Sequence, residues 1–355
     1  MDAADRPTIR DLAKALGLAI STVSMSLKDH PRISTKTRKR VQKKAREMGY
    51  LPDPRLASVM SYLKTKRSDK PVAGMAYVAS SSQYEQLEQH PIYHNYYLGA
   101  KARALELGYR LENYNLKLER MSGNRLVSVL QSRGIEGIII SPLFKVGEQL
   151  DIDWSELSAI TFGYSMTEKG INRVTIDQYL AVQRSLEAMA KLGYRRIGFV
   201  TLGDATNRMQ QRWEAALLAF QSTHSSQTPL PYYEGSDRSQ FLRWFKHHKP
   251  DALLCNGLKW AKFLHAEGLN CPEDYGYATL EHEAQQVQSA LMNDPLWAKQ
   301  FGSIAGMNQE SRYMGGLAAE LLAQDLALNL KGPSKRPKTT LIEGRWVDGL
   351  TLKRQ

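Results

Sequence analysis

The sequence predicts two folds in one chain, an all-α helix-turn-helix unit at the amino terminus and a doubly wound α/β body after it. Three observations lead to this prediction. The excess positive charge lies in the first fifth of the chain, the same segment shows helical periodicity around a glycine turn, and short apolar runs alternate with amphipathic segments from residue 71 onward. A chain of 355 residues is long enough for two or three domains.

The charge is distributed very unevenly. Residues 1–70 contain 17 Lys/Arg and 7 Asp/Glu, a balance of +10, whereas the other 285 residues contain 31 and 29, a balance of +2. A compact basic segment on a nearly neutral body is the electrostatic footprint of a nucleic-acid-binding domain. The alternative, a solvated basic tail, does not fit because the segment is patterned for folding.

Local signals predict three helices in this segment. Thr8 and Asp11 resemble a capping box at the start of the first helix, which Gly17 ends. A three-residue turn then leads to a second helix over residues 20–27, and Ser34 caps a third helix that stops at Gly49. Helix, tight turn and helix is an arrangement that lays the second helix in the major groove of DNA.

Five short motifs follow one another in this segment: Thr8-Ile9-Arg10-Asp11-Leu12-Ala13, Gly17-Leu18, Thr22-Val23-Ser24, Ser34-Thr35-Lys36-Thr37-Arg38 and Gly49-Tyr50-Leu51-Pro52. With these motifs the segment resembles the head-piece of the LacI/GalR family of repressors over about fifty residues.

The resemblance implies roles in binding double-stranded operator DNA. Base-reading positions fall on Ile20, Ser21 and Met25, and positions that face the phosphate backbone fall on Thr8, Thr22, Ser24, Ser34 and Thr37. Capping is the alternative role of Thr8 and Ser34. Two departures change what can be carried over: Ala19 stands where relatives have a capping serine, and Met25 cannot make the bidentate bond to guanine that an arginine makes.

Residues 52–70 are expected to form a hinge and linker. Pro52-Asp53-Pro54 ends the third helix, and residues 55–60 are long enough for a short helix. In the family such a helix forms on the operator and inserts an apolar side chain into the minor groove. Met60 is the preferred wedge, and Val59 takes its place if no insertion is allowed in the register.

The body, residues 71–348, alternates predicted strands and helices, which indicates parallel sheets covered by helices. The predicted strands are 72–78, 110–116, 137–140, 158–162, 197–200 and 252–255, and the predicted helices are 95–108, 126–133, 180–192, 212–220 and 314–326. Residues 349–355 form a short tail.

The body resembles the two-lobed, periplasmic-binding-protein-like core of the same family. The motifs are Val174-Thr175-Ile176-Asp177, Leu192-Gly193-Tyr194-Arg195-Arg196-Ile197-Gly198, Pro250-Asp251-Ala252 and Gly315 within Tyr313-Met314-Gly315-Gly316-Leu317-Ala318. The resemblance implies a ligand cleft between the lobes and three crossings of the chain, near residues 164–175, 300–310 and 340–346.

Ligands of doubly wound folds bind at the carboxyl ends of strands. That rule points to Ser80, Ser81, Ser141, Tyr164, Asn256 and Glu281, and the resemblance adds Arg212 and the crossover residue Gln309. Caps or surface groups are the alternative for each. Tyr93, Tyr96 and Trp213 could stack on a sugar ring, although aromatic residues at helical spacing are more often core.

The sequence therefore predicts a cytoplasmic, ligand-responsive transcriptional regulator, expected to be a repressor and a homodimer. The resemblance favours a carbohydrate effector, with a purine as the alternative, and implies no cofactor. A sugar-binding transport protein would explain the body but not residues 1–60, and the amino terminus does not read as a secretory signal. An enzyme is disfavoured because GxGxxG after the first strand, a P-loop and GxSxG are all missing. No apolar run approaches the ~20 residues of a membrane helix, and the scattered His and Cys suggest no metal site.

Overall fold

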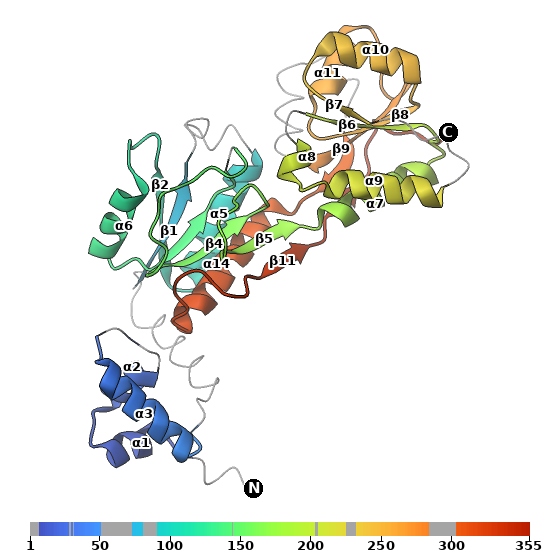
Figure 1. Ribbon diagram of the computed structural model, residues 1–355. Coiled ribbons are helices and arrows are strands. Elements are labelled where there is room, and N and C mark those ends of the chain that lie inside the picture. The colour runs from blue at the N-terminus through green and yellow to red at the C-terminus, as the bar shows by residue number, and fades with distance from the viewer. Residues whose placement is uncertain are drawn as a thin grey trace.

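The computed structural model describes residues 7–27, 30, 32–50, 73–80, 91–143, 145–202, 205–224, 232–283 and 303–355. They form a three-helix unit, here called the head-piece (residues 7–50), and two α/β lobes (Figure 1). Within these ranges, no helix combines the length and the apolar character needed to cross a membrane.

The head-piece consists of α1 (Ile9–Leu16), α2 (Ile20–Leu27) and α3 (Thr35–Glu47), as the periodicity predicts. Its core is built from apolar side chains of all three helices, among them the fully buried Leu12, Val23 and Val41. The capping box at Thr8 and the left-handed Gly17 at the end of α1 are confirmed. Long side chains of α3 also bind the ends of the other helices: Arg40 donates to the Leu16 carbonyl at 3.2 Å, and Gln42 donates to the Ser26 carbonyl at 3.3 Å.

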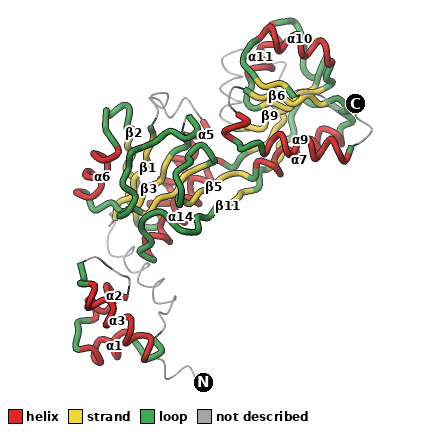
Figure 2. The backbone as a smooth tube through the Cα atoms, in the orientation of Figure 1, coloured by secondary structure: helices red, strands yellow, loops and turns green. Residues whose placement is uncertain are grey.

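Each lobe is built on a six-stranded sheet (Figure 2). In the first lobe the strand order is β11 (Thr339–Ile342), β5 (Asn172–Ile176), β4 (Ser158–Phe162), β3 (Gly137–Ile140), β1 (Ala73–Ala79), β2 (Tyr109–Asn115). In the second lobe it is β12 (Arg345–Val347), β10 (Ala305–Asn308), β9 (Gly276–His282), β8 (Ala252–Cys255), β6 (Ile197–Thr201), β7 (Tyr233–Glu234). Neighbouring strands are parallel except for the antiparallel pair β10 and β12.

Helices cover both faces of each sheet, which explains why the central strands are continuous apolar runs. In the first lobe, α5 (Pro91–Glu106) and α14 (Ser311–Ala327) share one core, and α6 (Gly123–Ser132) packs on the other face. In the second lobe, α7 (Gln178–Lys191) and α9 (Arg212–Thr223) cover one face, and α10 (Arg238–His248) and α11 (Lys259–Ala266) cover the other.

The chain crosses between the lobes at the carboxyl ends of strands, after β5, after β10 and after β11 (Figure 1). The last two crossings lie at the positions expected. The first crossing, expected near residues 164–175, comes just after that range. Met166 and Ile171 are buried in the core of the first lobe, and residues 172–176 form β5 of that lobe, so the crossing comes after Ile176.

Candidate functional site

The outer face of α2 carries the predicted base-reading residues. Ile20 is 46% exposed, Ser21 is exposed and Met25 is half-buried, while Val23 is fully buried. The predicted phosphate-facing residues Thr22 and Ser24 are half-buried on the same helix. Packing against the other two helices therefore leaves the predicted DNA-reading side chains on the accessible side of α2.

The hydroxyls at the helix starts have structural partners. Thr8 Oγ1 donates to Asp11 Oδ2 at 2.6 Å and accepts the Asp11 amide at 3.3 Å. The hydroxyl bond to Oδ2, together with the Thr8 amide that donates to the same oxygen at 2.8 Å, lowers the pKa of the Asp11 carboxyl. Ser34 accepts the Thr37 amide at 3.3 Å, and the two hydroxyl oxygens lie 2.9 Å apart. The capping role is thus present for Thr8 and Ser34, and a phosphate contact would be additional to it.

Two predicted site residues lie outside the described residues. They are Met60, predicted to contact the minor groove of DNA, and Ser81, predicted to contact the effector. The rest of the hinge, residues 52–70, also lies outside the described residues.

The two lobes contact one another where the carboxyl ends of their strands meet, and this region is here called the interlobe junction. Arg208, at the end of the short helix α8 (Ala205–Arg208), donates to the Tyr93 hydroxyl of α5 at 3.1 Å. Asn95 of α5 donates to Glu283, which follows β9, at 2.9 Å. Each bond joins the first lobe to the second.

A third interlobe contact joins two of the predicted ligand residues. The Arg212 guanidinium carbon at the start of α9 lies 4.0 Å from the ring centroid of Tyr164, a buried residue that follows β4. Arg173 of β5 lies beside the same ring, with its guanidinium carbon 5.6 Å from the centroid. Arg173 was not predicted, although its position directly before the motif at 174–177 is a signal that could have indicated it.

Two carboxylates lie on the second-lobe side of the junction. Burial raises the pKa of Glu283, against the opposing effect of the hydrogen bond from Asn95. Burial also raises the pKa of Glu281, which is half-buried, and the nearby positive charge of Arg208 opposes that shift. Glu281 was a predicted ligand residue, whereas Glu283 and Asn95 were not.

The remaining predicted ligand residues follow strands but differ in how they are used. Asn256 accepts the Leu202 amide at 2.8 Å, and Gln309 donates to the Leu280 carbonyl of β9 at 2.9 Å, so both side chains have structural hydrogen-bond partners. Ser80 and Ser141 are buried. Among the described residues, the Ser80 hydroxyl has no hydrogen-bond partner.

Of the three aromatic residues that could stack on a sugar, two lie in the core and one lies at the interlobe junction. Trp213 is 1% exposed and donates to Gln178 at 2.7 Å, and Tyr96 stacks on Phe162 with ring centroids 4.4 Å apart. Both belong to the core, which was the alternative for these residues. Tyr93 is half-buried and lies at the interlobe junction.

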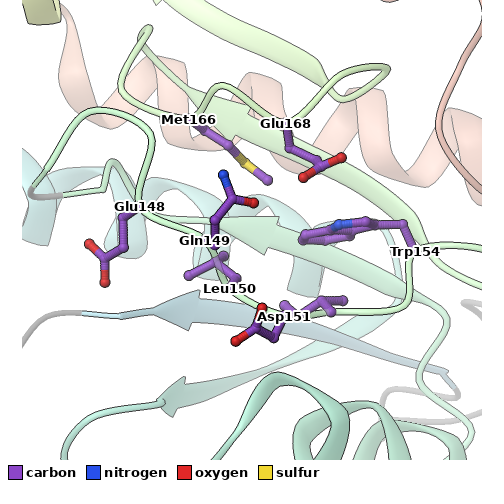
Figure 3. Close-up of a pocket in the computed structure, with 8 residues that line it drawn as sticks. Glu148, Gln149, Leu150, Asp151, Trp154, Met166 and Glu168 are labelled. Atoms are coloured by element: carbon purple, nitrogen blue, oxygen red, sulfur yellow. The ribbon is translucent and has the colours of Figure 1, made fainter.

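A cavity of about 230 Å³ lies elsewhere, within the first lobe (Figure 3). It is lined by Glu148, Gln149, Leu150, Asp151, Ile152, Trp154, Met166 and Glu168. None of the predicted ligand residues lines this cavity.

Comparison with known proteins agrees with both parts of the fold. Residues 8–53 match the model of bacterial regulatory proteins of the lacI family, and residues 186–352 match the periplasmic binding protein-like domain. The chain belongs to the LacI family of bacterial regulatory proteins. It is a DNA-binding regulator of transcription, as its helix-turn-helix unit indicates.

Named relatives of this LacI-family chain are regulators as well. The transcriptional regulator PtxS of Pseudomonas plecoglossicida is 25% identical over 295 residues, covering 78% of this chain and 79% of that protein. The regulator CelR of Thermobifida fusca is 22% identical over 373 residues, covering 97% of each.

Solved structures show the same fold. The structure of CelR in complex with cellobiose has a TM-score of 0.57 and 19% identity, over 98% of this chain and 100% of that one. The lac repressor dimer bound to operator and anti-inducer has a TM-score of 0.55 and 17% identity, with the same coverage.

Proposed function

We propose that this LacI-family regulator is a cytoplasmic repressor that binds its operator as a homodimer and is released or recruited by a small carbohydrate bound at the interlobe junction. The observation that carries the proposal is the convergence of polar side chains from both lobes at one place, with Arg212 against Tyr164 at its centre. Family members solved with cellobiose and with D-xylulofuranose support a sugar as the effector.

A ligand held by both lobes changes the lobes' relative orientation. Because Tyr93 with Arg208 and Asn95 with Glu283 already bond across the junction, a ligand's hydroxyls compete with these bonds and stabilise a different interlobe angle. Operator and effector then affect each other's affinity by the same factor. No reaction chemistry is needed for this role.

At the operator, we propose that Ile20, Ser21 and Met25 face base edges, with Ile20 and Met25 contacting thymine methyl groups. The hydroxyl residues that contact the DNA phosphate backbone are Thr8, Thr22, Ser24, Ser34 and Thr37. Met60 remains the proposed minor-groove wedge.

A gel-shift assay on the upstream region of the protein's own gene, with and without a sugar panel, tests this function. We expect duplex binding that one sugar changes, and we expect Arg212→Ala to bind duplex but lose the sugar response. Arg110→Ala is the matched control, since Arg110 is a largely exposed arginine of the first lobe. Duplex binding that is absent or insensitive to salt would contradict the proposal.

A further inference from the structure

Two guanidinium groups from different lobes flank Tyr164. Arg212 belongs to α9 of the second lobe and Arg173 to β5 of the first, and their guanidinium carbons lie 4.0 Å and 5.6 Å from the ring centroid. The tyrosine ring can stabilise a cation on its face, but it does not neutralise the charge of two.

Among the described residues, the hydrogen-bond acceptors of these two arginines are uncharged groups. Arg173 donates to the carbonyls of Gly163 at 3.0 Å and Met166 at 3.4 Å. Arg212 donates to the Met209 carbonyl at 3.4 Å and to the Gln210 amide oxygen at 2.9 Å. In the described parts of the chain, no ion pair involves Arg173 or Arg212, whereas Arg103, Arg133 and Arg345 each pair with a glutamate. Burial lowers the pKa of Arg173, and the charge of Arg212 adds to this effect.

The amino terminus of α9 adds to the positive potential. The helix begins at Arg212 without a side-chain cap, so its first-turn N–H groups add a partial positive charge. The two residues before it, Gln210 and Gln211, have φ values of 50° and 60°, a left-handed conformation that is costly outside glycine. Strain of this kind is commonly retained where a segment is shaped for a ligand. Glu214 is the acidic residue in the first turn, and no ion pair between it and Arg212 occurs among the described residues.

We propose that the effector is an anionic polyol, a sugar acid or a sugar phosphate, whose acidic group binds between Arg173 and Arg212 against Tyr164. This inference rests on the proposed function and narrows the class of its ligand. An anion would receive charge-assisted hydrogen bonds from both guanidinium groups and so join the lobes. Its hydroxyls would donate to the carboxylates on the other side of the junction, Glu281 and Glu283.

Thermal unfolding of the full chain tests the ligand class. The probes are D-gluconate, D-glucose 6-phosphate, inorganic phosphate and D-glucose, each at one fixed ionic strength made up with sodium chloride. We expect at least one anionic probe to raise Tm above the chloride and glucose values. A larger shift with gluconate indicates a carboxylate ligand, and a larger shift with glucose 6-phosphate and phosphate indicates a phosphate ligand.

Variants then locate the binding. We expect Arg173→Gln and Arg212→Gln each to lower the affinity for the anionic probe by at least about tenfold, because each substitution removes one charge-assisted contact. Arg110→Gln, an exposed arginine in the same lobe as Arg173, should leave the shift unchanged. Should Arg173→Gln not fold, Arg212→Gln decides the outcome.

Three results would overturn the inference. The first is a rise in Tm with glucose equal to that with the anionic probes, and the second is no rise in Tm with any anionic probe beyond that with chloride. The third is a rise in Tm with an anionic probe that both arginine variants retain, because the anion would then bind elsewhere, for example on the basic head-piece. Operator binding in a gel shift is measured on the same samples. If the chain binds operator and responds only to neutral sugar, the proposal of an anionic effector is contradicted but the proposed function is not. If the unaltered chain does not bind operator, the proposed function itself is contradicted.

Discussion

At the scale of single residues, the start of α2 lacks a capping side chain. Ala19 precedes the helix, and its carbonyl accepts the Val23 amide at 3.0 Å, but its methyl group cannot accept a hydrogen bond from the first turn. We predict that Ala19→Ser stabilises the head-piece by about 1 kcal/mol and tightens duplex binding several-fold, regardless of sequence. Head-piece unfolding and gel-shift titration measure the two effects.

Ala15→Ser is the control for that substitution. Ala15 is exposed inside α1, where serine costs a few tenths of a kcal/mol in helix propensity and caps nothing. Equal effects of the two serines would show that the missing cap does not limit the head-piece.

Glu283 makes the folded protein sensitive to pH. Burial raises its pKa above the ordinary value of 4.5, so the folded chain keeps a proton that the unfolded chain has released. Stability that involves this residue is therefore present at low pH and is lost as pH rises from 4.5 through the folded pKa. We predict that Glu283→Gln, which keeps an acceptor for Asn95, raises the urea midpoint at pH 7 and reduces its decline with pH.

The exposed Glu187 of α7 provides the comparison for that experiment. Glu187→Gln should leave the pH dependence of the urea midpoint unchanged. The explanation fails if both variants show the same pH profile as the unaltered chain.

At the scale of elements, α5 and α14 pack so closely that glycine is required at their contact. A Cβ on Gly315 would lie 2.1 Å from the Tyr96 carbonyl oxygen, and one on Gly99 would lie 1.9 Å from the Arg312 carbonyl oxygen. The neighbouring Gly316 has room, with Arg103 Cβ the nearest atom at 3.6 Å.

These two adjacent glycines give opposite predictions. Gly315→Ala should destabilise the chain by about 1–3 kcal/mol because the helices must separate. Gly316→Ala should stabilise it by roughly 0.5–1 kcal/mol because alanine is the better helix former. Chemical denaturation of the two variants compares them directly, and the same sign for both would contradict the close packing at Gly315.

At the scale of the whole molecule, the charge of the chain is separated from its ligand-binding body. With a balance of +10 in residues 1–70 and +2 in the rest, duplex binding depends mainly on the amino-terminal segment. We predict that operator affinity falls by about 10³-fold or more between 50 and 200 mM salt, as expected for six or more phosphate contacts. Fluorescence anisotropy over a salt series measures this slope.

Effector binding serves as the internal reference for the salt series. The interlobe junction lies in the nearly neutral body, so the effector's affinity should change far less than the operator's over the same range. If operator affinity and effector affinity fall equally with salt concentration, the uneven distribution of charge along the chain does not determine how strongly each ligand's binding depends on salt.

Local sequence determined the head-piece and most of the strand-helix alternation. The cap at Thr8, the turn at Gly17 and the apolar spacing of α1 act within a few residues, so they can be read directly. Eight elements of the second half were not predicted individually: α8, β7, α10, α11, β9, β10, β11 and β12. Several are strands of only two to four residues, too short to show a period.

Tertiary structure alone decided the composition of the interlobe junction. The sequence indicated Tyr164 and Arg212 separately, but only the fold brings them into contact and sets Arg173 beside them. Asn95 and Glu283 bond across 188 positions of sequence. Parallel strands bring distant residues to one edge, and the chain's three crossings set which edges meet, so no local pattern records these pairs.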